Sequence, residues 1–311
     1  MQNRSLLLVA PQQLEWVSET LPPLKPYEVR IKTSASAISI GSELARYLGQ
    51  ERHTATTHYP LMTGYESLGT IIETGSDVHD LPIGSRVVSF YGHRTIGTVP
   101  RLKALPVPPE ISDEQALLAI LSCDAAKGIH KLKPGSEDSI LISGAGAMGL
   151  LSVGILKSQG IRKIDIIDPL PERRKLALQL GARHAFDPSW PLHMPGNYNL
   201  GIECSSRNSA FELLQANLHQ GGRICILADG NYEPLVLSAC FHEKELTIIG
   251  SSDGLDYQSH ARRFFSYLAE HSTPLEDLFT YSIEADNLAR TFEEIANGSI
   301  QPIKVFVRYG S

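Results

Sequence analysis

The chain has 311 residues, a formal net charge of −6 and 42% hydrophobic residues. That length allows two domains with separate cores, and the composition is that of an ordinary globular protein. The acidic balance excludes the basic surface with which proteins bind nucleic acids or anionic membranes. No apolar run is long enough to span a bilayer, and the short N-terminal one predicts a first strand rather than a secretory leader. We therefore expect a cytoplasmic protein with no nucleic-acid or membrane partner.

The four cysteines give no sign of a disulfide framework or a zinc cluster. They are Cys123, Cys204, Cys225 and Cys240, and no two of them have the C-x-x-C spacing. Scattered thiols of this kind are typical of a reducing compartment.

The first third of the chain predicts a compact β-rich domain. Short runs of β-branched residues recur at 14–19, 28–39, 67–76 and 85–91, and most prolines lie between them. Such runs, separated by Gly and Pro, are typical of strands joined by turns.

The pattern changes near Ser112, which with Glu114 and Gln115 predicts the start of a helix. Continuous apolar strands then alternate with amphipathic helices, which is typical of a parallel sheet covered on both faces. The strands are expected at 139–143, 162–168, 199–205, 222–228 and 245–252, and the helices at 147–159, 172–180 and 210–218. Two further helical segments and a closing strand at 303–309 suggest that the chain returns to the first domain.

A glycine-rich turn follows the buried strand 139–143. Gly144, Gly146 and Gly149 form a G-x-G-x-x-G pattern, and Ala147 and Met148 open the helix behind it. In this context the first glycine permits the tight turn, the second lets a pyrophosphate approach the backbone, and the third lets helix and strand pack closely. The helix N-terminus then offers free N–H groups to the phosphates. The pattern predicts a Rossmann dinucleotide-binding domain.

An acidic residue completes this fingerprint. Asp168 ends the next strand, 19 residues after Gly149. A carboxylate there accepts hydrogen bonds from the ribose hydroxyls and repels a 2′-phosphate, so the sequence favours NAD over NADP. Arg173 and Arg174 follow closely and leave NADP open, although they can equally be solvated helix charges.

The order of these landmarks resembles the medium-chain dehydrogenase/reductase superfamily, whose best-known members are zinc alcohol dehydrogenases. The resemblance covers nearly the whole chain. It is carried by GYESLGTIIETGSDV (64–78), IGSRV (83–87), KPG (133–135), SGAGAMGLL (143–151), ERRKLALQLGA (172–182), IECSS (202–206), GGRICIL (221–227), ELTIIGSS (245–252) and IKVFV (303–307).

This resemblance implies an α/β fold with two domains and a hydride-transferring oxidoreductase activity. Residues 1–121 with 253–311 would form a β-rich, GroES-like catalytic domain, and 122–252 the Rossmann domain. It also implies a homodimer, in which the edge strand near 245–252 pairs with its twin. Lining positions for the cofactor would be Cys204, Ser205, Leu227, Gly250 and Ser251.

The chain departs from the family where zinc enzymes bind catalytic zinc. The segments that match the ligand motifs are Ile40-Gly41-Ser42-Glu43 and Gly64-Tyr65-Glu66, and the third ligand position falls near Ile120, with Cys123 close by. Isoleucine and tyrosine cannot build the open three-ligand site that a catalytic zinc needs, so we expect no metal. The histidines His53, His58, His79 and His93 have no ligand spacing, and we expect them at surface or loop positions.

Without a metal, other groups must handle the proton. Ser42 matches the family's hydroxyl residue beside the substrate, Tyr65 can donate a phenolic proton, and Glu66 flanks both. Lys127 could stabilise an oxyanion. The structural alternatives are a Tyr65 that only fills the volume of the missing zinc, a solvated Lys127, and a Ser42 that caps a turn.

The sequence thus favours a zinc-independent, NAD(H)-dependent oxidoreductase that interconverts a secondary alcohol and a ketone. A weaker likeness to bacteriochlorophyllide hydroxyethyl dehydrogenases implies a bulky small-molecule substrate. Two alternatives stay open: an NAD(P)H-dependent quinone or enoyl reductase, and a dinucleotide-binding protein without turnover.

Overall fold

The computed structural model describes residues 3–50, 58–189, 198–228 and 233–310. Two compact units are present, and each is described by itself. None of the helices in these ranges is long and apolar enough to cross a membrane. Unit 1 comprises Met1–Ile120, Asp256–Glu270 and Phe279–Ser311, and unit 2 comprises Leu121–Leu255 and His271–Leu278.

This division differs from the predicted one mainly in one segment, although Leu121 and residues 253–255 also group with unit 2. The sequence placed all of 253–311 with the β-rich domain, whereas residues 271–278 group with unit 2. The reason is local packing, because Leu275 of the 3-10 helix η3 (Leu275–Leu278) lies against a helix of unit 2 at Gly154.

Unit 1 is built on a seven-stranded sheet with the order β15-β16-β3-β5-β6-β8, and β7 pairs with β3. Its long central strand β3 pairs antiparallel with β5, β7 and β16. A separate three-stranded sheet has the order β2-β1-β4. The bounds are β1 Asn3–Ala10, β2 Gln13–Glu19, β3 Glu28–Ile38, β4 Leu61–Met62, β5 Glu66–Thr74, β6 Arg86–Ser89, β7 Ile96–Pro100, β8 Leu105–Pro106, β15 Tyr281–Glu284 and β16 Val305–Arg308.

The strands β3 and β5 approach each other very closely at one glycine. A Cβ on Gly69 would lie 2.2 Å from the carbonyl oxygen of Lys32, so only glycine fits there. On one face of the sheet, Val29, Ile31 and Ile71 are fully buried in a common apolar cluster.

Short helices cover this β-rich unit. Ser112 caps α2 in a capping box with Gln115, which confirms the predicted helix start. The sequence did not predict α1, which follows β3 directly; its Tyr47 packs against Phe292 of α9 with ring centroids 5.5 Å apart. The bounds are α1 Ile40–Tyr47, η1 Arg101–Lys103, α2 Asp113–Leu117, α8 Tyr257–Glu270, η4 Ala285–Asn287 and α9 Leu288–Ala296.

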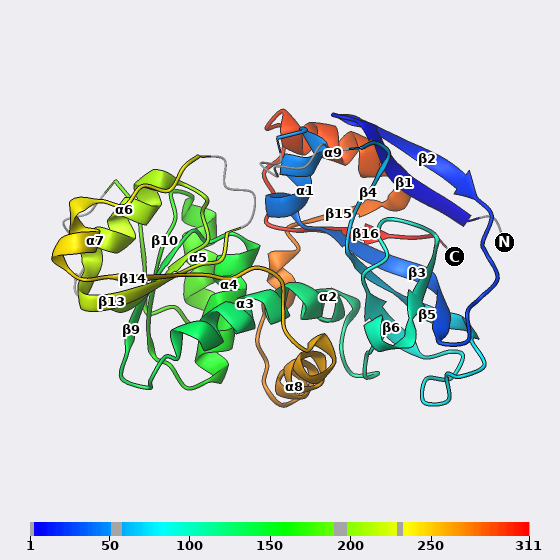
Figure 1. The fold of residues 1–311 in the computed structure, drawn as a ribbon, viewed down its shortest axis with the longest axis horizontal. Helices are drawn as coiled ribbons and strands as arrows, with labels where there is room; N and C mark the ends of the chain where they lie inside the picture. The colour runs from blue at the N-terminus through cyan, green and yellow to red at the C-terminus, as the bar shows by residue number, and fades with distance from the viewer. Residues whose placement is uncertain (1–2, 51–57, 190–197, 229–232, 311) are drawn as a thin grey trace. The chain divides into compact units, whose positions relative to one another are not determined.

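Unit 2 is a six-stranded sheet with the order β11-β10-β9-β12-β13-β14 (Figure 1). All neighbouring pairs are parallel. This is the strand order of a doubly wound Rossmann sheet, in which strands are added to one side of β9 and then, from β12 on, to its other side. It confirms the predicted fold class. The bounds are β9 Ser139–Ser143, β10 Lys163–Ile167, β11 His184–Phe186, β12 Tyr198–Glu203, β13 Leu218–Ile226 and β14 Thr247–Gly250.

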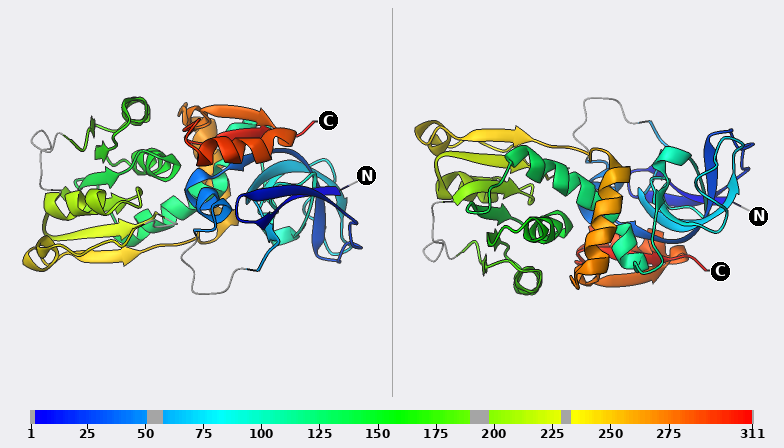
Figure 2. Two further views of the ribbon diagram at one scale, coloured as in Figure 1. Left: turned by 90° about the horizontal axis from the view of Figure 1, so that it is seen from above. Right: turned by 90° about the horizontal axis from the view of Figure 1, so that it is seen from below.

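The helices of unit 2 connect these strands and cover their apolar faces. Ile140, Leu141 and Ile142 of β9 are completely buried, as the apolar run predicted. Figure 2 shows β14 beside β13 at one margin of the sheet, with α7 at their end. The helix bounds are α3 Ala119–Leu132, α4 Ala147–Ser158, α5 Pro171–Gln179, α6 Asn208–Asn217 and α7 Ala239–Glu243.

Candidate active site

The glycine-rich turn between β9 and α4 leaves space beside its middle glycine. Gly144 has φ +91°, and a Cβ there would lie 3.1 Å from the backbone of Cys204. A Cβ on Gly149 would lie 1.9 Å from the carbonyl oxygen of Gly144. Nothing lies within 4 Å of a Cβ on Gly146, the N-cap of α4. Two glycines are thus required by the protein itself, and the third leaves open space at a helix N-terminus, where phosphates bind well.

Asp168 is attached to this same turn. Its Oδ2 accepts a hydrogen bond from the backbone N–H of Ala145 at 2.7 Å, and its Oδ1 accepts one from Leu170 at 2.9 Å. Each carboxylate oxygen can accept a second bond, so lone pairs remain for ribose hydroxyls. Arg174 donates to the carbonyls of Asp168 and Pro169, while Arg173 is half-buried one residue earlier on α5.

The loop after β12 lies against the glycine turn and is held by a buried carboxylate that the sequence analysis missed. Glu203 accepts hydrogen bonds at Oε1 from the backbone N–H of Ser205 at 2.7 Å, from its hydroxyl at 2.6 Å, and from the N–H of Ser206 at 3.1 Å. Burial raises the pKa of Glu203, and these bonds oppose the shift. Its Oε2 has no hydrogen-bond partner among the described residues.

The remaining predicted cofactor positions lie at the carboxyl ends of β13 and β14. Leu227 is buried and contacts α3, since a Cβ on Gly128 would lie 2.3 Å from its Cδ2. The Ser251 hydroxyl, close behind Gly250, is buried and has no partner in the described part of the chain. At this edge of the sheet, Glu203 Oε2 can therefore still accept a hydrogen bond, and the Ser251 hydroxyl can still donate or accept one.

Lys127 lies in unit 2, whereas the other predicted proton-handling residues belong to unit 1. Its Nζ donates to the carbonyl oxygen of Ser252 at 2.8 Å, and the neighbouring Lys131 donates to that of Gly250 at 2.7 Å. Both ammonium groups therefore secure the segment that follows β14.

In unit 1, the structure brings Ser42 and Tyr65 together. The Ser42 hydroxyl on α1 lies 3.1 Å from the phenolic oxygen of Tyr65, immediately before β5, and donates to the carbonyl of Ser39 at 3.3 Å. Burial and the charge of Glu66 hold the pKa of Tyr65 well above its usual value, against hydrogen bonds with Ser39 and Ser42. The phenol is therefore protonated at neutral pH, and the hydrogen bonds with Ser39 and Ser42 are the contacts that favour release of its proton.

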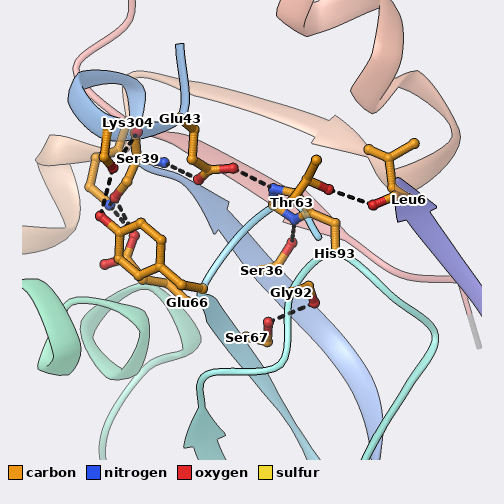
Figure 3. A network of polar contacts seen from close by, with 12 residues as sticks. Leu6, Ser36, Ser39, Glu43, Thr63, Glu66, Ser67, Gly92, His93 and Lys304 are labelled. Carbon is orange, nitrogen blue, oxygen red and sulfur yellow. Dashed lines mark hydrogen bonds and ion pairs between the residues drawn. The ribbon is translucent and has the colours of Figure 1, made fainter. Parts of the chain in front are cut away.

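Glu66, the residue after Tyr65, forms a buried ion pair with Lys304, and Ser39 is bonded to both (Figure 3). The Lys304 ammonium donates to Glu66 Oε2 at 2.5 Å and to the Ser39 hydroxyl at 2.8 Å. Ser39 in turn donates to the same Glu66 oxygen at 2.5 Å. Burial raises the pKa of Glu66, and Lys304 opposes the shift. Among the described residues, Glu66 Oε1 has no partner. Sequence reasoning missed Ser39 and Lys304.

A second arm of the network runs from Ser39 toward β3. Glu43 Oε1 accepts the backbone N–H of Ser39 at 2.8 Å, and Oε2 lies 3.1 Å from His93 Nε2. His93 Nδ1 is 2.9 Å from the Ser36 hydroxyl. A Cβ on Gly64, whose φ is +73°, would come within 2.8 Å of the His93 ring. His93 lies in the loop between β6 and β7, in keeping with the expected surface or loop position, but its side chain is fully buried.

The residues at the expected zinc positions do not fit a catalytic zinc. Ile40 and Ile120 offer no lone pair, and Tyr65 carries a protonated phenol that is bonded to Ser42. In addition, no three His, Cys, Asp or Glu side chains of the described ranges converge so as to hold a metal ion.

Comparisons with known families place both units. Residues 25–102 match a family model described as "Alcohol dehydrogenase GroES-like domain", and residues 147–266 match one described as "Zinc-binding dehydrogenase". The chain is 29% identical over 245 residues to an L-threonine 3-dehydrogenase of Burkholderia mallei (strain SAVP1), which covers 66% of this chain and 71% of the relative.

Two solved structures share the fold along almost the whole chain. A protein from Sinorhizobium meliloti 1021 described as a zinc-binding dehydrogenase, with NADP bound, has a TM-score of 0.86 at 18% identity, and 99% of each chain is covered. An alcohol dehydrogenase from Escherichia coli CFT073, described as short chain and complexed with NADH, has a TM-score of 0.85 at 21% identity, again with 99% of each chain covered.

Fold, motif order and these matches define one class of protein, the oxidoreductases of the alcohol dehydrogenase type. Within that class the chain belongs to the medium-chain dehydrogenase/reductase superfamily, as the sequence landmarks predicted.

Proposed function

We propose that the protein is a zinc-independent, NAD(H)-dependent oxidoreductase that interconverts a secondary alcohol and a ketone. The observation that carries this proposal is the protonated phenol of Tyr65, bonded to Ser42 at 3.1 Å, where the family motif has a zinc ligand. A proton donor at that place can perform the task that a metal performs elsewhere, which is to neutralise charge on the substrate oxygen.

The reaction balances with these groups alone. A nicotinamide dinucleotide, held by the Gly144–Gly149 turn and Asp168, would supply the hydride for the carbonyl carbon. In the reducing direction the Tyr65 O–H bond breaks and gives its proton to the carbonyl oxygen. Ser42, hydrogen-bonded to the same phenol, orients it and stabilises the phenolate that forms. Oxidation of the alcohol is the reverse of these steps.

Support for NAD over NADP comes from Asp168. Its carboxylate is fixed by Ala145 and Leu170 and keeps lone pairs for two ribose hydroxyls. A 2′-phosphate in the same place would meet a negative charge. The bound cofactors of the structural neighbours do not decide the matter, because one of them holds NADP and another NADH.

The cofactor part is tested by titrating the protein with NADH and with NADPH, following nicotinamide fluorescence. We expect NADH to bind more tightly, and Asp168→Ala to lose that preference. Gly310→Ala is the control, because a Cβ at Gly310 meets nothing within 4 Å. No binding of either cofactor by the wild-type protein would refute the proposal.

The reaction is tested with matched panels of ketones and α,β-unsaturated ketones, including bulky cyclic members, after dialysis against a chelator. Reduction of ketones to alcohols at an unchanged rate after chelation supports the proposal. Reduction of the C=C bond alone would identify a double-bond reductase, and tight NADH binding with no turnover on either panel would identify a non-catalytic binding protein.

We also propose a homodimer formed through β14. This strand ends the sheet of unit 2 in the described part of the chain, and Val236 and Leu237 before α7 are 51% and 54% exposed. Pairing with a second copy would satisfy the free edge of the strand. Sedimentation should give twice the chain mass at micromolar concentration; a monomer there would contradict the dimer.

A further inference from the structure

We propose that Lys304 and Ser39 are positioning residues of the acid site: Lys304, acting through the Ser39 hydroxyl, returns a proton to Tyr65 after each reduction, and Glu66 is its counter-ion. The proposal rests on the proposed function and extends it to residues that no sequence motif indicates.

The burial of the pair is the first argument. The side chains of Lys304 and Glu66 are both 0% exposed, and Ser39 is 5% exposed. Removing two charges from water costs several kcal/mol per ion, and apolar residues of similar volume often serve stability as well or better. A fully buried Lys–Glu pair beside a catalytic candidate therefore calls for a function other than stability.

The connection to Tyr65 is the second argument. Tyr65 is 3.1 Å from the hydroxyl of Ser42, which donates to the carbonyl of Ser39 at 3.3 Å, so the phenol lies beside the turn that carries Ser39. The Ser39 hydroxyl accepts from Lys304 at 2.8 Å and donates to Glu66 at 2.5 Å, and its hydrogen bond with Tyr65 opposes the rise in the pKa of the phenol. One hydroxyl thus touches the ammonium and the phenol.

Proton transfer along this path balances. After Tyr65 has given its proton to the substrate oxygen, the Ser39 O–H bond breaks and its proton goes to the phenolate. A Lys304 N–H bond breaks in turn and restores the Ser39 hydroxyl. Lys304 is left as a neutral amine beside Glu66. Because its side chain is fully buried, it regains its proton by the same path in reverse: a solvent proton reaches Tyr65 once the product has left, the Tyr65 proton passes to Ser39, and the Ser39 proton passes to Lys304. Ser39 needs only to rotate its O–H from Glu66 Oε2 to the phenolate.

The charges around Tyr65 fit this role. Glu66 on β5 and Glu43 on α1 both raise its pKa, and Glu43 is itself bonded to His93. Lys304, next to β16, supplies the ammonium that is bonded to Glu66 and Ser39. Its proton consequently lies on a hydrogen-bonded path that reaches the phenol through one side chain, that of Ser39.

A first experiment needs no substrate. It compares Glu66→Gln/Lys304→Arg with Glu66→Gln/Lys304→Met, which differ only in the charge at position 304, since arginine keeps its proton. The Tyr65 phenolate is followed by ultraviolet absorbance against the same variants carrying Tyr65→Phe. We expect phenolate in the arginine variant at a pH lower by about one unit or more. Adding Ser39→Ala should remove most of that difference.

A second experiment uses turnover and Lys304→Arg alone, which keeps the ion pair and so favours folding. Arginine cannot release a proton, so kcat for the best ketone of the panel should fall by a factor of about ten or more, with KM and NADH affinity within about two-fold. Lys25→Met is the matched control, because Lys25 forms an exposed pair with Glu28.

The two experiments distinguish coupling of Lys304 to Tyr65, proton return by Lys304, and the proposed function. Equal phenolate midpoints in the arginine and methionine variants would overturn the proposal, because a purely structural pair does not reach Tyr65. A difference in midpoint with full activity of Lys304→Arg would overturn proton return. Failure of the wild-type protein to bind NADH would instead refute the proposed function, and the phenolate measurement would still decide whether Lys304 is coupled to Tyr65.

Discussion

The two units encode their functional groups in opposite ways. In unit 2 the candidate cofactor site is a continuous turn, Gly144–Gly149, with Asp168 fixed to its backbone by one hydrogen bond of 2.7 Å. In unit 1 the candidate acid site joins Ser39, Tyr65 and Lys304, which are far apart in the chain and stand next to the ends of β3, β5 and β16. The first site depends on backbone shape, and the second on side-chain charges that meet only after folding.

The contrast teaches what each site tolerates. A backbone site fails when a side chain enters space that the ligand needs, whereas the stability of the protein need not change. A buried charge site fails in both respects, since removal of one partner leaves the other unpaired in the interior. The predictions below use that difference.

The largest expected effect is the loss of kcat in Tyr65→Phe. Tyr65→Phe removes the proposed acid and should lower kcat by a factor of about 100 to 10,000. NADH affinity should stay within about two-fold, because the cofactor site lies in unit 2. Steady-state kinetics with the best ketone and a fluorescence titration make the measurement. If kcat falls less than about three-fold, Tyr65 is only a space-filling residue.

Gly146→Val tests the backbone site. A Cβ at this position meets no protein atom within 4 Å, so thermal stability should hardly change. The added methyl groups would occupy the space of the pyrophosphate, and NADH should bind about 100-fold more weakly. Gly149→Val, by contrast, should destabilise the protein, since its Cβ would overlap the Gly144 carbonyl. Equal melting temperatures of the two variants would contradict this division.

Lys304→Met tests the charge site through stability. It leaves Glu66 buried and unpaired, and the free energy of unfolding should fall by about 3–5 kcal/mol. Adding Glu66→Gln should recover much of the loss, because the uncompensated carboxylate is then gone. Urea unfolding of the two variants makes the comparison, and a double variant no more stable than the single one would argue against it.

A pH effect on the fold must be separated from any pH effect on the site. Burial lowers the pKa of His260 on α8 from 6.5 to about 4. The unfolded chain therefore binds this proton first, and stability should fall by about 1–3 kcal/mol as the pH drops from about 6.5 to about 4. His260→Phe should show a smaller loss over that interval in urea unfolding; an unchanged loss would mean that other groups cause it.

The smallest expected effect is that of Lys127→Met. The Lys127 ammonium is bonded to the carbonyl of Ser252 in unit 2 and takes no part in the proposed proton transfer. We therefore expect kcat to change less than about three-fold. A loss of kcat comparable to that of Tyr65→Phe would instead indicate that Lys127 is a catalytic residue.

The sequence predicted the strand, glycine turn and helix of the candidate cofactor site well because their information is local. The spacing of Gly144, Gly146 and Gly149 after an apolar strand specifies a turn, and β9 and α4 lie where the pattern put them. The Ser42–Tyr65 contact could be expected only through the family motif. That contact is present in the structure, whereas the chemical role of the pair stays a proposal.

The rest could not be predicted from local patterns. Lys304 lies in the apolar run IKVFV, which predicts a strand but not what its one lysine contacts. Its partner Glu66 is 238 residues away in the chain. His93 has no ligand spacing, so nothing in the sequence indicated that Gly64 leaves room for its ring in the interior. These contacts follow from the pairing of β3 with β5 and β16.

The ammonium of Lys304 is part of the polypeptide, so every folded molecule carries it. A metal ion, by contrast, has to be imported and bound in competition with other proteins. Under the proposed function, an enzyme built around the Lys304–Glu66 pair would start work as soon as it folds and would keep its activity in a cell starved of zinc.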